Sequence, residues 1–497
     1  MILGDIDLWV LAIYAAGLLV FGASFARRNR TPEAFIKASG RLPGWAVGLS
    51  LFGTFLSSNT FLGVPGNAYS GNWNSYTFSL TLPFAAWAAS RWFVPFYRHG
   101  GHVSAYHHLE ERFGRWARTY AVVCYLLTQL ARVGSILFGV SLALSALTGW
   151  SLGTLILASG VLVTFYTLVG GIEAVIWTDV VQSIVLSAGA LLILGVLVVE
   201  TPGGLGTMVE QGLAFDKFSL GSFGFDLTTS TFWVVFAYGL FINLNNFGID
   251  QSYVQRFHAA ESDAEARRSV WLAAALYVPI SLLFFFLGTA LFVHVQTSVP
   301  LQAELEALAG PAAEVGDRVL PHFIATRLPT GIAGLIVAAL FSAAVSSVDT
   351  SLNSSATVAL EDLWKPYVES QPSADRSLSL LRAGTLIMGV AGTGTALAMT
   401  SVRGLLDAWW TLSGIFAGGV LGLFLLGRVA RHAERAAAMT ATALGVTVIL
   451  WMTLSPLLEG DLAWLRSPLH ANLIIVFGTS TIFLSGLLFA GRKAPRS

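Results

Sequence analysis

Apolar stretches long enough to cross a bilayer recur from one end of this chain to the other. A helix of about 20 apolar residues spans the hydrocarbon core, which is roughly 30 Å thick. Only 11% of the 497 residues are charged, whereas an average soluble domain has about 25% charged residues. The longest polar connections, near 200–228 and 297–329, leave no room for a separate soluble domain. These features predict an all-α polytopic membrane protein.

The charges in the loops predict how the spans are oriented. We place about thirteen spans, at 7–25, 43–70, 73–97, 117–147, 151–169, 174–199, 230–254, 266–295, 330–363, 379–400, 404–427, 437–456 and 468–491. Of the 28 lysines and arginines, 22 then lie on one side of the membrane, five lie on the other, and Arg132 lies within a span. Because basic loops face the cytoplasm, the N-terminus is expected outside and the C-terminus inside, in the plasma (inner) membrane.

The composition argues against several classes of protein. No basic patch carries interleaved aromatics, so no nucleic-acid partner is expected. The single cysteine, Cys124, rules out an intrachain disulfide framework and a cysteine-based metal site. No histidine pairs with a mid-membrane serine, so we expect neither an enzyme nor an organic cofactor. No obligate protein partner is indicated.

A histidine-rich cluster stands outside the predicted spans. The segment His107-His108-Leu109-Glu110-Glu111 can in principle bind a metal, because imidazole and carboxylate are common metal ligands. It lies on a charged cytoplasmic connection, and we interpret it as a solvated face.

Oxygen donors line one face of the predicted span 330–363. At helical spacing, one stripe carries Ala343, Ser346, Ser347, Thr350, Asn353, Ser354 and Thr357. Small hard cations prefer oxygen ligands, although small residues also allow membrane helices to pack closely. Asp349 favours the cation site, because an acid inside a membrane span is costly and usually functional.

Two spans, 43–70 and 230–254, are predicted to be broken at mid-depth. The first contains a Ser-Ser-Asn-Thr run followed by Pro65, and the second contains three asparagines followed by Gly248. Discontinuous helices at matching positions of two halves indicate an inverted repeat with its site at the bilayer midplane. The alternative is that glycine, proline and asparagine merely kink these helices.

Two charged residues within spans each allow two interpretations. Arg132 is the only basic residue away from a span end. It either pairs with a structural acid such as Asp407 or binds an anionic substrate with its planar fork. Asp179, near the start of the span 174–199, is either favoured there by the helix dipole or acts as a cation ligand or relay. The sequence alone favours neither role for Asp179.

Three motifs resemble those of the solute:sodium symporter family, whose members have the LeuT-type fold. They are Gly170 to Gln182, with the pattern Gly-Gly-x-x-x-Val-x-Trp-Thr-Asp-x-x-Gln, then Asp250 to Arg256, and Ala343 to Ser354. Within the family the chain is most similar to bacterial sialic-acid symporters, on the stretches Gly40 to Ala46, Leu56 to Phe61 and Ser104 to Arg112.

The resemblance covers nearly the whole chain and implies a LeuT-type 5+5 inverted repeat. The divisions would be 1–42 for the first transmembrane helix and a cytoplasmic loop, 43–200 for the first five-helix repeat, 201–430 for the second, and 431–497 for two C-terminal helices.

The resemblance also implies sodium sites. The main site would use carbonyls of Gly53, Leu56 and Ala343 with the hydroxyls of Ser346 and Ser347. Some family members bind a second sodium, whose positions here would be Asp179, Ser346, Asp349 and Thr350. The sialic-acid type has serine at two of these positions, where this chain has Asp349 and Thr350. One or two sodium ions are therefore expected, and Asp349 could instead carry a proton or form a structural pair.

The solute site implied by the resemblance departs from the sialic-acid type. Its positions are Ser57, Thr60, Ser75, Ser79, Arg132, Phe241, Asn243 and Asn246. Phe55 stands where that type has threonine, while Ser75 and Ser79 replace a phenylalanine and a glutamine. The expected function is sodium-coupled import of a small organic solute, a carboxylate such as sialic acid, by alternating access. A sugar or other neutral solute, or coupling to protons in the same fold, is the alternative.

Overall fold

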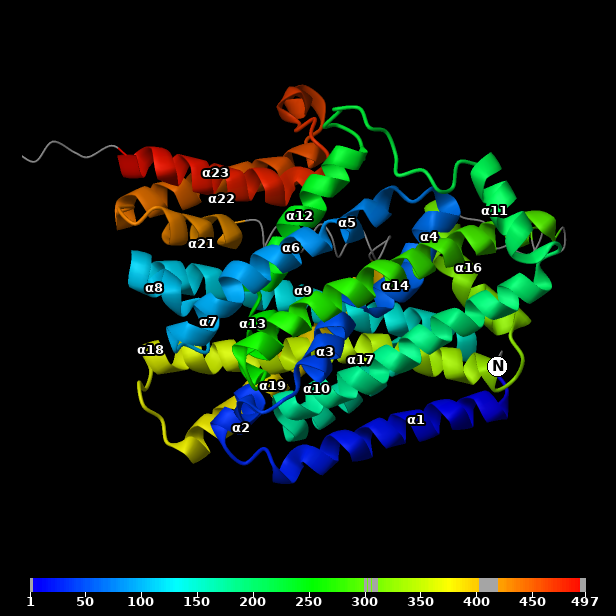
Figure 1. Ribbon diagram of the computed structural model, residues 1–497, viewed down its shortest axis with the longest axis horizontal. Helices are drawn as coiled ribbons and strands as arrows, with labels where there is room; N and C mark the ends of the chain where they lie inside the picture. Colours follow the sequence, from blue (N-terminus) through cyan, green and yellow to red (C-terminus); the bar gives the residue numbers. More distant parts are fainter. Residues whose placement is uncertain (1–2, 299–301, 303–304, 306–311, 402–418, 492–497) are drawn as a thin grey trace, which may run out of the picture.

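The structure, a computed structural model, describes residues 3–298, 302, 305, 312–401 and 419–491. Long helices lie side by side along the long axis of the molecule (Figure 1). Within the described residues, nine helices are long and apolar enough to cross a membrane, or ten if one bent pair counts as a span. The prediction of an all-α polytopic membrane protein is therefore confirmed.

The long helices follow the predicted spans closely. They are α1 (Asp5–Ser24), α9 (Arg115–Thr148), α10 (Leu152–Glu200), α12 (Phe232–Ile249), α14 (Asp263–Thr297), α17 (Ile332–Val358), α19 (Ala374–Ala398), α22 (Arg435–Leu454) and α23 (Ile474–Gly491). Shorter helices include α2 (Pro32–Lys37), α8 (His107–Phe113), α11 (Gly204–Ala214), α16 (Ala312–Arg327) and α18 (Lys365–Tyr367). In Figure 1, α21 to α23 gather along one edge of the molecule and α1 lies along the opposite edge.

Two predicted spans are not described as single long helices. The span 73–97 is a succession of short helical segments: α5 (Thr77–Leu80), α6 (Leu82–Ala88), the π-helical η4 (Ala89–Phe93) and α7 (Val94–Gly100). The span 404–427 lies mostly outside the described residues, as does Asp407, and its end is described as α21 (Val420–Val429).

A glycine divides α10 into two helical parts. Gly171 has φ 58° and ψ −168°, a conformation that residues with a Cβ rarely adopt. A Cβ at this position would also lie 3.1 Å from Phe35 Cα. The predicted boundary between the spans 151–169 and 174–199 falls at this break.

The predicted break in the span 43–70 is confirmed. Helix α3 (Gly44–Phe55) ends before two extended residues, Leu56 and Ser57, and α4 (Ser58–Ser70) follows. The segments 44–55 and 60–70 are bent by 51° from one another. Ser57 caps α4, since its Oγ accepts the backbone N–H of Thr60 at 3.4 Å.

The predicted position of the second break is wrong. The asparagines of the span 230–254 remain helical within α12, and the chain becomes extended only at Asp250. Helix α13 (Gln251–Ala259) begins there, because the Asp250 carboxylate accepts the N–H of Ser252 at 2.8 Å and caps the new helix. An N-cap, rather than the run of asparagines, decides where this span breaks.

Helix α17 forms the centre of the molecule. It packs against α10, α9, α19 and α1, and it runs through the middle of the helical stack in Figure 1. Every residue from Ile336 to Val358 is buried. Its polar side chains therefore have to find partners within the protein rather than in lipid or water.

Candidate ion and solute site

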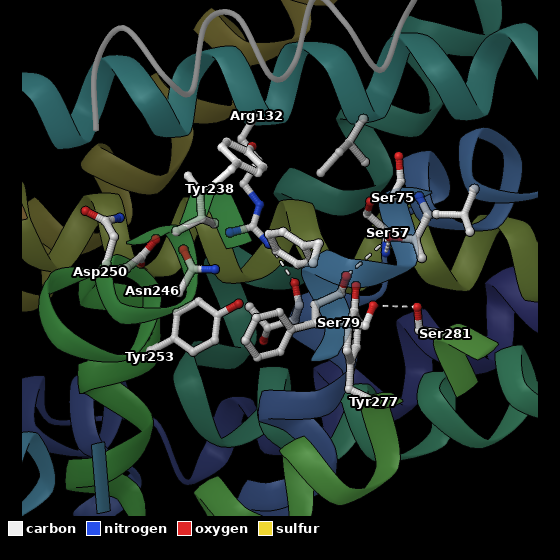
Figure 2. A pocket seen from close by; sticks show the side chains of 18 of the residues that line it. Ser57, Ser75, Ser79, Arg132, Tyr238, Asn246, Asp250, Tyr253, Tyr277 and Ser281 are labelled. Atoms are coloured by element: carbon white, nitrogen blue, oxygen red, sulfur yellow. Dashed lines mark hydrogen bonds between the residues drawn. The ribbon is translucent and has the colours of Figure 1, made fainter. Parts of the chain in front are cut away.

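A cavity of about 170 Å³ lies beside the break between α3 and α4. Six of the predicted solute residues line it: Ser57, Thr60, Ser75, Ser79, Arg132 and Asn246. These residues come from four parts of the fold: the break after α3 with the first turn of α4, the segment 75–79, α9 and α12. Figure 2 shows five of them, with labels. The cavity thus lies at mid-length of α9, where a discontinuous helix meets continuous ones.

Arg132 supplies the cationic side of the cavity. Its side chain lies within α9 and is only 9% exposed. Nη2 donates a hydrogen bond of 2.7 Å to the carbonyl oxygen of Thr54 in the last turn of α3. A guanidinium that lines a buried cavity can bind a carboxylate with two parallel hydrogen bonds. Asp407, the structural partner considered from the sequence, lies outside the described residues.

Asp250 supplies a carboxylate to the same cavity. Its Oδ1 caps α13, and its Oδ2 accepts a hydrogen bond of 3.4 Å from Gln129 Nε2. Sequence reasoning placed Asp250 in a family motif and assigned it no role at the site. Asp250 enters the cavity because the break of the second discontinuous span falls on it.

Hydroxyl groups and aromatic rings complete the wall. Ser79 Oγ and Ser281 Oγ lie 2.7 Å apart, and the cavity is further lined by Tyr238, Tyr253 and Tyr277 (Figure 2). The Phe55 ring packs against Tyr253 and Tyr277, with centroids 5.1 and 5.2 Å apart. This wall can bind hydroxyl groups and cover apolar parts of a solute.

Two predicted solute residues do not line the cavity. Phe241 packs against the hydrophobic core. Asn243 is buried elsewhere and donates a hydrogen bond of 3.0 Å to Thr81 Oγ1. Since α12 stays helical here, its cavity face carries Tyr238, Ile242, Asn245 and Asn246. The resemblance implied Asn243 as a solute residue, but at helical spacing it lies on a different face of α12 from these four.

The oxygen atoms predicted to bind the main sodium ion lie where α3 meets α17. Ser347 Oγ lies 3.5 Å from the carbonyl oxygen of Leu56, which is in the extended break after α3. A Cβ built on Gly53 would be 3.4 Å from Ser346 Oγ, so these two positions are also close. Ala343 is buried one turn earlier on the same face of α17. Carbonyl and hydroxyl oxygens are suitable ligands for a hard cation.

The second predicted sodium position is bridged by an arginine. Arg256 Nη2 lies 2.8 Å from Asp179 Oδ2 and 2.6 Å from Thr350 Oγ1. Ser346 Oγ lies 2.5 Å from the other oxygen of Asp179. Arg256 follows the predicted span 230–254 in the sequence and is fully buried within the protein. Its extended side chain reaches from α13 into the polar centre of the protein.

Asp349 forms a separate buried contact. Its Oδ2 accepts a hydrogen bond from the Tyr166 hydroxyl. Its Oδ1 has no hydrogen-bond partner within the described part of the chain, although the residue is fully buried. Arg256 forms its ion pair with Asp179, and a further cation beside Asp349 would balance the charge of the second buried carboxylate.

Known proteins match this chain over most of its length. The model of the sodium:solute symporter family matches residues 35–445. The sodium/sialic acid symporter SiaT of Proteus mirabilis is 32% identical over 499 residues, which cover 99% of this chain and 96% of SiaT. Human sodium-coupled monocarboxylate transporter 1 is 29% identical over 485 residues, which cover 95% of this chain and 77% of that transporter.

A solved structure is similar over almost the whole length. It is a substrate-bound, outward-open Na+-coupled sialic acid symporter with a novel Na+-site. The two chains share 31% sequence identity and a TM-score of 0.88, and the match covers 99% of each. The resemblance expected from the motifs is thereby confirmed, and with it the prediction that the protein is not an enzyme. The chain belongs to the sodium:solute symporter family.

Proposed function

We propose that this protein imports a small organic anion together with sodium by alternating access. The observation that carries the proposal is the hydrogen bond from Arg132 Nη2 to the Thr54 carbonyl. Thr54 stands between Gly53 and Leu56, the two α3 positions of the proposed sodium site. Because one short backbone segment serves both sites, sodium that holds this segment in place also orders the wall of the solute cavity.

The solute class follows from charge and from the relatives. Arg132 is the cationic group of the cavity, and its fork suits a carboxylate. Two relatives are named for acids, sialic acid in one case and monocarboxylates in the other. Serine hydroxyls, Asn246 and Asp250 would bind hydroxyl groups elsewhere on the solute. A hydroxylated carboxylic acid of the sialic-acid kind satisfies both sets of groups.

The membrane arrangement that we propose has thirteen spans in a LeuT-type 5+5 repeat. The nine long helices and the bent pair α3–α4 account for ten. The break at Gly171 divides α10 in two, the segments of 73–97 add another, and the span ending in α21 adds the last. The 22 basic residues on one side favour an N-terminus outside and a C-terminus in the cytoplasm.

The same proposal divides the chain into four parts. They are a first helix with its cytoplasmic loop at 1–42, repeats at 43–200 and 201–430, and two additional helices at 431–497. The breaks at Leu56 and Asp250 support the repeats, because each interrupts the first helix of its repeat.

We propose two sodium ions per cycle. The first binds at Gly53, Leu56, Ala343, Ser346 and Ser347. The second binds beside Asp349, because the ion pair of Arg256 is with Asp179 and a sodium ion would balance the charge of this second buried carboxylate. Each net positive charge that moves inward gains roughly 2.3 kcal/mol per 100 mV, which supports about fifty-fold accumulation of solute. With a solute that carries one negative charge, one sodium ion makes the cycle electrically neutral, and the second ion supplies this net charge.

A thermal-shift screen of the purified protein tests the function. Organic acids, sugars and amino acids are added in sodium chloride or in choline chloride. A ligand that binds the folded state raises the melting temperature, and we expect a carboxylate to do so more strongly in sodium. If only neutral sugars respond, the proposed solute class is wrong. If no ligand responds better in sodium than in choline, coupling to sodium is wrong.

A proton-coupled symporter of the same fold is the second candidate. The buried Asp349 oxygen without a partner favours it, because a protonated carboxyl carries no charge. Uptake into proteoliposomes at equal pH on both sides distinguishes the two. A sodium gradient drives uptake under these conditions if the main proposal is correct, whereas a proton-coupled protein needs a pH gradient or a membrane potential.

A further inference from the structure

Three potential metal ligands converge outside the ion and solute sites. His102 lies in the connection after α7, and His107 and Glu111 are one turn apart on α8. The two Nε2 atoms of His102 and His107 are 3.2 and 3.7 Å from Glu111 Oε1. All three potential ligand atoms lie within 4.8 Å of one another. In Figure 1, α7, α8 and α18 lie at the same end of the molecule.

These distances suit a tetrahedral metal ion. Zinc binds imidazole nitrogen and carboxylate oxygen at about 2.0–2.2 Å, which places neighbouring ligand atoms roughly 3.3 Å apart. Two imidazoles and one carboxylate leave a fourth position for water. Both histidine side chains are partly exposed, at 43% and 31%, so an ion from solution can reach them.

The two imidazole rings are stacked, with centroids 3.7 Å apart. Rings that bind one tetrahedral ion through their Nε2 atoms diverge from the ion, so one of these partly exposed side chains has to rotate when an ion binds. The interpretation of this segment as a merely solvated face left out His102, which helical spacing does not bring to Glu111.

We propose that His102, His107 and Glu111 form a binding site for a divalent transition metal of the zinc type. The effect of a bound ion on transport rests on the proposed alternating-access function.

The loop that carries His102 connects two parts of the protein. Gln251 of α13 accepts the N–H of Ala105 at 2.8 Å and donates to the Val103 carbonyl at 3.0 Å. On the other side, Ser104 Oγ donates to both oxygens of Asp362, at 2.6 and 2.7 Å, beyond the end of α17. The loop therefore bridges the second broken span and the central helix.

Helix α8 is tied to the same region by Arg118. Its Nη1 lies 2.6 Å from Glu110 Oε2, and its Nε lies 2.6 Å from Asp362 Oδ1. The loop contacts Asp362 directly, and α8 is connected to Asp362 through Arg118. A metal ion bound to His102 and to α8 would add a direct link between the loop and α8. Alternating access requires α13 to move relative to α17, so bound metal is expected to slow transport.

Metal binding is tested first, with no solute present. Titration of the purified protein with zinc, in competition with a chromophoric chelator, is expected to show one ion bound per chain. His102→Ala and Glu111→Gln each lower the affinity at least about ten-fold, in line with loss of a ligand. His432→Ala, at an exposed histidine outside the cluster, is the matched control and leaves binding unchanged. Absence of binding, or equal binding by all four proteins, overturns the site.

The effect on transport is measured separately. Sodium-driven uptake is compared in proteoliposomes that hold zinc or a chelator on both faces. We expect zinc to slow the original protein and to have little effect on His102→Ala, whose melting temperature without metal shows that it is folded. Zinc that binds but does not slow uptake overturns the regulatory step alone. No uptake in the chelator contradicts the proposed function and not the metal site.

Discussion

Arg256 and Asp179 form an ion pair of 2.8 Å in which neither side chain is exposed to solvent. Arg256 Nε also lies 2.7 Å from Ser50 Oγ, and Nη2 lies 2.6 Å from Thr350 Oγ1. One side chain of α13 thus joins α3, α10 and α17 beside the proposed sodium sites. If α3 and α13 move relative to α10 and α17 during transport, these contacts have to break and form again.

Arg256→Ala is expected to destabilise the protein by about 3–5 kcal/mol, because it leaves Asp179 as an uncompensated buried charge. The melting temperature in detergent measures the loss. Arg267→Ala removes an exposed arginine from the neighbouring helix and serves as the control. The double variant with Asp179→Asn should be more stable than Arg256→Ala alone. A double variant that is less stable would contradict the charge argument.

Arg132→Ala is expected to weaken binding of an anionic solute by about 2–5 kcal/mol, or roughly thirty-fold or more. The loss follows from removing the cationic group of a buried cavity. Solute titrations in saturating sodium measure it. Arg115→Ala, on the same helix with a 67% exposed side chain, is the matched control. Unchanged affinity of Arg132→Ala would show that Arg132 has a structural role only.

Asp349→Ser is expected to lower the sodium Hill coefficient of uptake from nearly two towards one, since this coefficient is limited by the number of coupled sites. Serine restores the residue that the sialic-acid type carries and keeps a hydroxyl near Tyr166. Initial uptake rates over a range of sodium concentrations give the coefficient. If the coefficient stays the same while the pH dependence of uptake changes, Asp349 carries a proton and does not bind sodium.

Gly171→Ala is expected to destabilise the protein by about 1–3 kcal/mol, because alanine is strained at φ 58° and ψ −168°. Its Cβ would also crowd Phe35. Gly195→Ala lies in the same helix with open space around it, and it should leave stability unchanged or raise it. Melting temperatures of the two variants provide the comparison. Equal effects would mean that the break in α10 needs no glycine.

Local properties of the sequence were sufficient for the long apolar helices and for the first break. Hydropathy depends on composition over about 20 residues, and a Ser-x-x-Thr cap acts within one turn. The face of α17 with Ser346 and Ser347 follows from helical periodicity. Arg132 is conspicuous because charges are rare within spans. Each of these features can therefore be read without knowing which helices are neighbours.

The tertiary structure decided which distant residues meet. Arg256 reaches Asp179 across 77 positions, and His102 meets Glu111 because a loop returns over α8. Asp250 lines the cavity and Asn243 does not, because the break falls at Asp250 and the packing of α12 turns Asn243 away from the cavity. Such contacts depend on how helices are rotated and packed against one another. That arrangement is set by many long-range contacts at once, and the periodicity of a single segment does not contain it.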